Sequence, residues 1–109
     1  MHTKATEIKT KPSIKVSLID GTIILEPPMY AVLIHNNYFT PFEFVIAILC
    51  DFFGKSAAEA DKIAQLAHHN GMAVVEITTK DIAETKVARV QWVVAQNGFP
   101  LKFNIEMDS

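Results

Sequence analysis

Two helix-start signals in the middle of the chain constrain its fold more than any other feature. Thr40-Pro41-Phe42-Glu43 and Ser56-Ala57-Ala58-Glu59 each place a hydroxyl residue three positions before a Glu, which is the pattern of a capping box. Pro41 suits the first helical position, because no intrahelical bond needs its missing N–H there. The signals predict one helix from Pro41 to about Phe53 and a second from Ser56 to Asn70.

The apolar residues of both segments recur at helical spacing. The predicted core face of the first helix carries Phe42, Val45, Ile46, Leu49 and Phe53. That of the second helix carries Ile63, Leu66 and Ala67. Gly54 and Gly71 suit the ends of the two helices, since glycine readily closes a helix in the left-handed conformation.

Short apolar runs around these helices predict strands. Residues 29–35 are apolar on both faces, residues 72–78 follow the second helix, and residues 101–107 alternate apolar and polar side chains. A third helix is expected from Thr79 or Lys80 to Asn97-Gly98, and its predicted core face carries Ala83, Val87, Val90 and Val94. The order strand, helix, helix, strand, helix, strand predicts an α+β fold. Three helices would pack on one face of a small, mainly antiparallel three-stranded sheet.

Residues 1–26 are expected to form an extension that precedes a domain at residues 27–109. Alternation within residues 14–25 and the dipeptide Asp20-Gly21 predict a short hairpin with a type I′ turn. Pro27-Pro28 then interrupts regular structure. The polar residues 1–12 are expected to be loose.

Composition and charge exclude several classes of function. The formal net charge is −2 and the ten Lys and Arg residues are scattered, whereas a nucleic-acid-binding domain would carry a basic patch. No run approaches the roughly 18 apolar residues of a membrane span, and the first residues lack the apolar core of a signal peptide. Cys50 is the only cysteine, so no intramolecular disulfide can form. We therefore expect a cytoplasmic protein that contacts neither nucleic acid nor membrane.

Sequence motifs for catalysis or metal binding are missing. His2, His35, His68 and His69 lack the spacing of a metal site, and the four glycines form no phosphate-binding loop. Cys50 lies in an apolar helical stretch and is expected to act as a small buried hydrophobe. The chain is expected to be a binding module without a cofactor or a metal, not an enzyme.

Two segments are candidates for a recognition site, and each also has a purely structural interpretation. Asn36 and Asn37 follow a strand, where they either form a turn or offer carbonyl acceptors at the mouth of a pocket. His68 and His69 end a helix, where an imidazolium is stabilised by the helix dipole. Phe42 is consistent with a pocket wall and equally with the core.

Three runs, taken in order, resemble the ClpS family of Clp protease adaptors, which recognise N-degrons. The family pattern is approximately Asn-Asp-Asp-Tyr-Thr-Pro-Met-Glu-Phe-Val, and residues 36–45 match it without a gap as Asn-Asn-Tyr-Phe-Thr-Pro-Phe-Glu-Phe-Val. The second run is His68-His69-Asn70-Gly71, where the family has a helix ending near Ala-x-His-x-x-Gly. The third is Ala83-Glu84-Thr85-Lys86. The resemblance extends from about Pro27 to Met107.

The resemblance implies a non-enzymatic, monomeric adaptor. It would bind the free N-terminal residue of an N-degron substrate, bulky hydrophobic or aromatic, and deliver the substrate to a Clp AAA+ unfoldase. Family roles assign the α-amine contacts to Asn36, Asn37 and His68. The expected side-chain pocket is formed by Phe42, Val45, Ile46, Ala64 and Ala67. Docking on the N-terminal domain of the unfoldase is expected at Glu84 and Lys86.

The chain departs from the family pattern at three positions of this expected site. Asn37 and Tyr38 stand where the family has Asp, and Phe42 stands where it has Met. An amide facing the amine in place of a carboxylate would weaken binding by about 1–2 kcal/mol. Two functions are therefore kept open: an N-degron adaptor with altered specificity, or an adaptor-like regulator or decoy that docks on the unfoldase without binding N-degrons.

Overall fold

The computed structural model describes residues 15–108. Its elements, in order, are β1 Lys15–Ile19, β2 Thr22–Glu26, β3 Met29–His35, α1 Phe42–Phe53, α2 Ala57–Asn70, β4 Met72–Thr79, α3 Lys80–Gln96 and β5 Phe103–Asp108. The expectations for residues 1–14 and for Ser109 lie outside the described residues. Within residues 15–108, no helix combines the length and apolar character needed to cross a bilayer.

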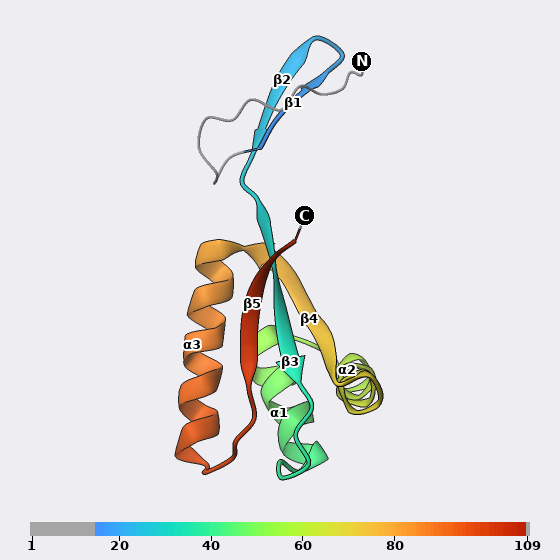
Figure 1. Ribbon diagram of the computed structural model, residues 1–109, viewed down its shortest axis with the longest axis vertical. Helices are drawn as coiled ribbons and strands as arrows, with labels where there is room; N and C mark the ends of the chain where they lie inside the picture. The colour runs from blue at the N-terminus through green and yellow to red at the C-terminus, as the bar shows by residue number, and fades with distance from the viewer. Residues whose placement is uncertain (1–14, 109) are drawn as a thin grey trace.

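The domain is built around the central strand β3. It pairs antiparallel with β4 on one side and with β5 on the other, so that Ile34 lies opposite both Ala73 and Phe103. These three side chains belong to one buried cluster with residues from α1, α2 and α3. Figure 1 shows α3 beside β5 and α2 beside β4, with α1 between them. The predicted α+β arrangement is confirmed.

The three helices contribute differently to the core. Helices α1 and α3 bury large side chains, which include Ile48, Leu49, Val90 and Val94. Helix α2 buries only alanines, at positions 60, 64 and 67. The prediction that Leu66 belongs to the core face was wrong, because its side chain is 43% exposed. The alanines at positions i, i+4 and i+7 form the inward face of α2 instead.

The two helix-start signals have different outcomes. At α2 the capping box is formed: the Ser56 hydroxyl accepts from the Glu59 amide at 3.1 Å, and the Glu59 carboxylate accepts from the Ser56 amide at 3.0 Å. At α1 the prediction was wrong. Pro41 is the N-cap residue and makes no side-chain capping bond, while the Thr40 hydroxyl donates instead to Asn37 Oδ1 at 3.1 Å.

Strands β1 and β2 form a separate two-stranded hairpin. Asp20 and Gly21 at its turn both have positive φ, of 50° and 77°, as a type I′ turn requires. Pro27 and Pro28 connect β2 directly to β3. Figure 1 shows the hairpin projecting beyond the end of the three-stranded sheet, away from the helices.

Candidate functional site

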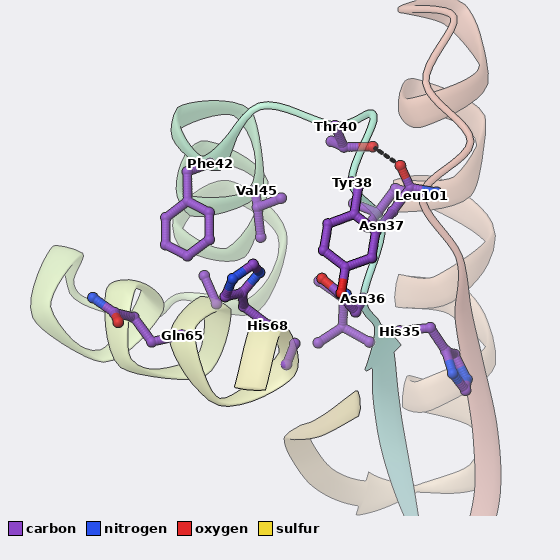
Figure 2. A pocket seen from close by; sticks show the side chains of 13 residues that line it. His35, Asn36, Asn37, Tyr38, Thr40, Phe42, Val45, Gln65, His68 and Leu101 are labelled. Atoms are coloured by element: carbon purple, nitrogen blue, oxygen red, sulfur yellow. Dashed lines mark hydrogen bonds between the residues drawn. The ribbon is translucent and has the colours of Figure 1, made fainter. Parts of the chain in front are cut away.

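A pocket of about 380 Å³ opens where the loop after β3 meets helix α2 (Figure 2). Its apolar lining includes Phe42 and Val45 from α1 and two alanines from α2. Its polar lining comes from the loop and from α2. The residues around it are Ile34, His35, Asn36, Asn37, Tyr38, Thr40, Phe42, Val45, Ala64, Gln65, Ala67, His68 and Leu101. None of them is Asp, Glu, Lys or Arg, so the polar groups of the pocket are amides, hydroxyls and imidazoles.

Backbone hydrogen bonds hold the two sides of the pocket together. The Asn36 amide donates to the Gly71 carbonyl at 2.8 Å, which ties the loop after β3 to the end of α2. Gly71 has φ 91° and caps the helix by donating to the Ala67 carbonyl at 2.9 Å. A glycine is favoured at this position because side chains disfavour positive φ. The helix end that carries His68 is thus fixed relative to Asn36.

The side chain of Asn37 organises the loop between β3 and α1. Its Oδ1 accepts from the Phe39 amide at 2.8 Å and from the Thr40 hydroxyl at 3.1 Å. Its Nδ2 donates to the Pro100 carbonyl at 3.3 Å, in the segment that leads to β5. The turn interpretation of Asn37 is therefore correct, and the same side chain lies in the wall of the pocket.

His68 lies between two aromatic rings. Its imidazole meets the Tyr38 ring edge-on at 5.8 Å between ring centroids, and the Phe42 ring edge-on at 6.3 Å. Figure 2 shows the imidazole directed from α2 towards the space between the loop and α1. His69, its neighbour in sequence, does not line the pocket. Of the two histidines at this helix end, His68 is the one placed to contact a ligand.

Four of the five residues expected in a side-chain pocket do line it. Val45, Ala64 and Ala67 are buried, and Phe42 is partly exposed at the entrance. Ile46 does not line the pocket and packs instead against the core. The reason is helix geometry, since adjacent residues of an α-helix point about 100° apart. Val45 therefore faces the pocket and Ile46 cannot share its direction.

Other lining residues were not anticipated from the sequence. Thr40 and Gln65 add polar groups, and the buried Leu101 closes one wall. Leu101 was predicted to begin the last strand, whereas β5 begins at Phe103. The segment just before β5 is held by the bond between Pro100 and Asn37 and by the His35 amide, which donates to the Lys102 carbonyl at 3.0 Å. These long-range contacts leave no local signal in the sequence.

Glu84 and Lys86, expected to contact an unfoldase, lie on α3 and do not line the pocket. Glu84 is exposed. Lys86 forms a salt bridge with Glu76 of β4 at 3.0 Å, and its ammonium lies 5.8 Å from the centre of the Phe53 ring. Lys86 therefore has a structural role in joining α3 to the sheet.

The described part of the chain contains no group of three His, Cys, Asp or Glu side chains that could hold a metal ion. Cys50 is half-buried on α1 and does not line the pocket. The site offers an apolar cavity bordered by amide, hydroxyl and imidazole groups. Such a cavity suits a ligand with one large apolar group next to a polar one.

Comparison with known families identifies one that covers most of the chain. The model of the family described as "ATP-dependent Clp protease adaptor protein ClpS" matches residues 25–104. The chain is 44% identical over 90 residues to the ATP-dependent Clp protease adapter protein ClpS of Desulfotalea psychrophila, which covers 83% of this chain and 88% of that one. It is 38% identical over 108 residues to the ClpS adapter of Desulforapulum autotrophicum, with 99% of this chain and all of the relative covered.

A solved structure shares the fold. The structure of Agrobacterium tumefaciens ClpS2 bound to L-phenylalaninamide superimposes with a TM-score of 0.74 and 36% sequence identity. The match covers 76% of this chain and all of that one. The ligand of that neighbour combines a free α-amine with an aromatic side chain.

Proposed function

The chain belongs to the ClpS family of Clp protease adaptors, and we propose that it binds the free N-terminal residue of substrate proteins and delivers them to a Clp AAA+ unfoldase. The pocket between α1, α2 and the loop after β3 is the observation that supports this proposal. The role is binding and delivery, so it requires no catalytic residue. The cytoplasmic location remains a prediction from the sequence.

The apolar part of the pocket is suited to a bulky first side chain. Val45, Ala64 and Ala67 present hydrocarbon surface, and the alanines leave room that larger residues would fill. Burying a Leu or Phe side chain contributes about 1.5–3 kcal/mol. We propose that Phe, Leu, Trp or Tyr at the first position of a substrate occupies this space.

The polar part of the pocket is suited to an α-amine. An ammonium group carries a positive charge and three N–H donors, so it needs acceptors that converge on it. We propose that the side chains of Asn36, Asn37 and His68 supply them. An internal peptide segment has no free amine. It would leave these acceptors without hydrogen-bond donors, so the pocket would not bind it.

A peptide titration tests this function. Peptides that begin with Phe, Leu, Trp or Tyr, each with a free and an acetylated amino terminus, are titrated against the full chain by fluorescence anisotropy. We expect saturable binding of the free forms and loss of binding on acetylation, whereas equal binding of both forms would disprove the proposal. Asn36→Ala is expected to weaken binding of the free peptides, and His69→Ala, one residue outside the pocket, is the matched control.

The alternative is a regulator that docks on the unfoldase without binding N-degrons, and one observation favours it. Asn37 Oδ1 already accepts two hydrogen bonds within its own loop, which reduces its capacity to accept from an amine. A complex with the N-terminal domain of a Clp unfoldase, detected by analytical ultracentrifugation without any peptide affinity, would establish this alternative. Glu84 and Lys86 are the proposed docking residues in both cases.

A further inference from the structure

We propose that Tyr38 forms a second subsite, which receives the side chain of the second substrate residue and favours aromatic or large apolar residues there. The proposal rests on the function proposed for the pocket, since it concerns the residue that follows the bound N-terminal one. It assigns a specificity role to a position where this chain departs from the family pattern.

Tyr38 combines exposure with a place in the pocket wall. Its side chain is 79% exposed, yet it is among the lining residues. The ring stays next to the pocket through its edge-on contact with His68 at 5.8 Å. Figure 2 shows the ring on the loop side of the pocket, across from α2. An aromatic ring with most of its surface open to solvent is available to pack against an incoming side chain.

The path of a bound substrate passes this ring. If the first side chain fills the apolar cavity and its amine contacts His68, the chain must leave the pocket at its mouth. The second Cα lies about 3.8 Å from the first, so its side chain begins at the rim. Because Tyr38 contacts the same imidazole that would bind the amine, its ring lies within reach of that second side chain.

The electrostatic character of the mouth supports an apolar contact. The residues that line the pocket include no Asp, Glu, Lys or Arg, so none of these four side chains within the lining selects a charged second residue. Aromatic contact is then the distinguishing interaction available there. An aromatic pair adds about 0.5–1.5 kcal/mol beyond simple area burial, which corresponds to about two- to thirteenfold in affinity.

Phe39 provides a matched control within the same loop. Its side chain is 80% exposed, as open as that of Tyr38, but it does not line the pocket. A general effect of exposed aromatic residues on peptide binding would depend on both rings. A subsite at the mouth of the pocket would depend on Tyr38 alone.

The experiment titrates peptides that begin with Phe and differ only in the second residue, which is Trp, Leu, Gly or Asp. Binding is measured by isothermal titration calorimetry to the full chain and to the variants Tyr38→Ala, Tyr38→Phe and Phe39→Ala. We expect the Trp peptide to bind about two- to thirteenfold tighter than the Gly peptide. Tyr38→Ala should remove this preference, so that the Trp and Gly peptides bind it with equal affinity, whereas Tyr38→Phe and Phe39→Ala should retain the preference.

Two outcomes overturn the subsite while leaving the proposed function intact. One is equal affinity for all free peptides regardless of the second residue. The other is an equal loss for every peptide in Tyr38→Ala, which would mean that Tyr38 only positions His68. Binding that survives acetylation of the amino terminus would instead overturn the proposed function itself.

Discussion

Asn37 stands where the ClpS family pattern has Asp, and its side-chain amide makes a hydrogen bond that a carboxylate could not make. Its Oδ1 accepts two hydrogen bonds within the loop, and a carboxylate could do the same. Its Nδ2, however, donates to the Pro100 carbonyl, and a carboxylate has no proton to donate. The amide joins the loop to the segment before β5, at the cost of the charge that would attract an ammonium group.

We therefore expect Asn37→Asp to have opposite effects on stability and on binding. Losing the bond to Pro100 should lower the free energy of unfolding by about 1 kcal/mol, measured by urea denaturation. If the site binds an α-amine, the new charge should raise affinity for a free Phe peptide by up to about tenfold at low salt. The gain should shrink as salt screens the charge.

Asn37→Ala separates these two contributions, because it removes all three hydrogen bonds and adds no charge. We expect it to lower the free energy of unfolding by about 1–3 kcal/mol and to weaken peptide binding. Weaker binding in Asn37→Asp, as well as in Asn37→Ala, would show that loop geometry matters more than charge at this site.

At the scale of helices and strands, the two helix starts show what the sequence could predict and what it could not. Both segments carry the same capping pattern, and only Ser56-Glu59 forms the box. At α1 the helix begins one residue later than the pattern implies, with Pro41 as its N-cap, and the Thr40 hydroxyl donates to Asn37 Oδ1. A capping pattern describes four consecutive residues, so it contains no information about a side chain three residues upstream that orients Thr40, in a loop that is tied to Pro100.

The capping box at α2 makes a prediction about pH. Hydrogen bonds from the Ser56 amide, the Ser56 side chain and, to a smaller extent, the charge of Lys55 hold the pKa of Glu59 below its ordinary value. A depressed pKa means that the stabilisation is complete above about pH 4.5 and is lost as the pH falls through the pKa of the folded state. Urea denaturation of the wild type and of Glu59→Gln should show a difference in stability at pH 7 that narrows below pH 4. A difference that is constant with pH would contradict this account.

The sequence predicted the inward face of a helix correctly where that face carries large apolar side chains. In α1 and α3 the apolar spacing identified Leu49, Phe53, Val90 and Val94, all of them buried. In α2 Leu66 was misleading, because its side chain is exposed, whereas Ile63 packs against the core and the fully buried positions are alanines. Periodicity weighted by side-chain size overlooks a face made of small residues, which allow close packing without a strong hydrophobic signal.

Lys86 joins α3 to the sheet, so its replacement should affect stability. Glu76 is only 15% exposed, and Lys86→Ala would leave its carboxylate without a partner. We expect a loss of about 1–3 kcal/mol in the free energy of unfolding, measured by chemical denaturation. Glu84→Ala, on the exposed side of the same helix, is the control and should change stability by less than about 0.5 kcal/mol.

This expectation bears on any test of unfoldase docking. Loss of docking in Lys86→Ala is informative only if the variant remains folded under the conditions of the assay. Adding Glu76→Gln to Lys86→Ala removes the unpaired charge and should recover part of the stability. A Lys86→Ala variant as stable as the wild type would show that the salt bridge contributes nothing measurable.

At the scale of the whole molecule, residues 15–108 form one domain with a buried core and a projecting hairpin. The domain from β3 to β5 contains the buried cluster and the pocket. The hairpin forms its own two-stranded sheet, and its Leu18, Ile23 and Leu25 side chains are exposed. The register places Leu18 opposite Ile23 and Val16 opposite Leu25, so one hairpin face is entirely apolar. An isolated two-stranded hairpin is marginally stable in water.

We therefore expect removal of residues 1–26 to leave the domain folded and its pocket unchanged. The residues of the pocket and of the buried cluster all lie after Glu26, and among the described strands β3 pairs with β4 and β5 and not with the hairpin. The truncated chain should unfold in one cooperative transition, with a midpoint within about 3 °C of the full chain by differential scanning calorimetry. Affinity for a free Phe peptide should be equal in the two forms. A midpoint lowered much further would mean that the first 26 residues stabilise the domain, and a lower affinity at an unchanged midpoint would mean that they contribute to the site directly.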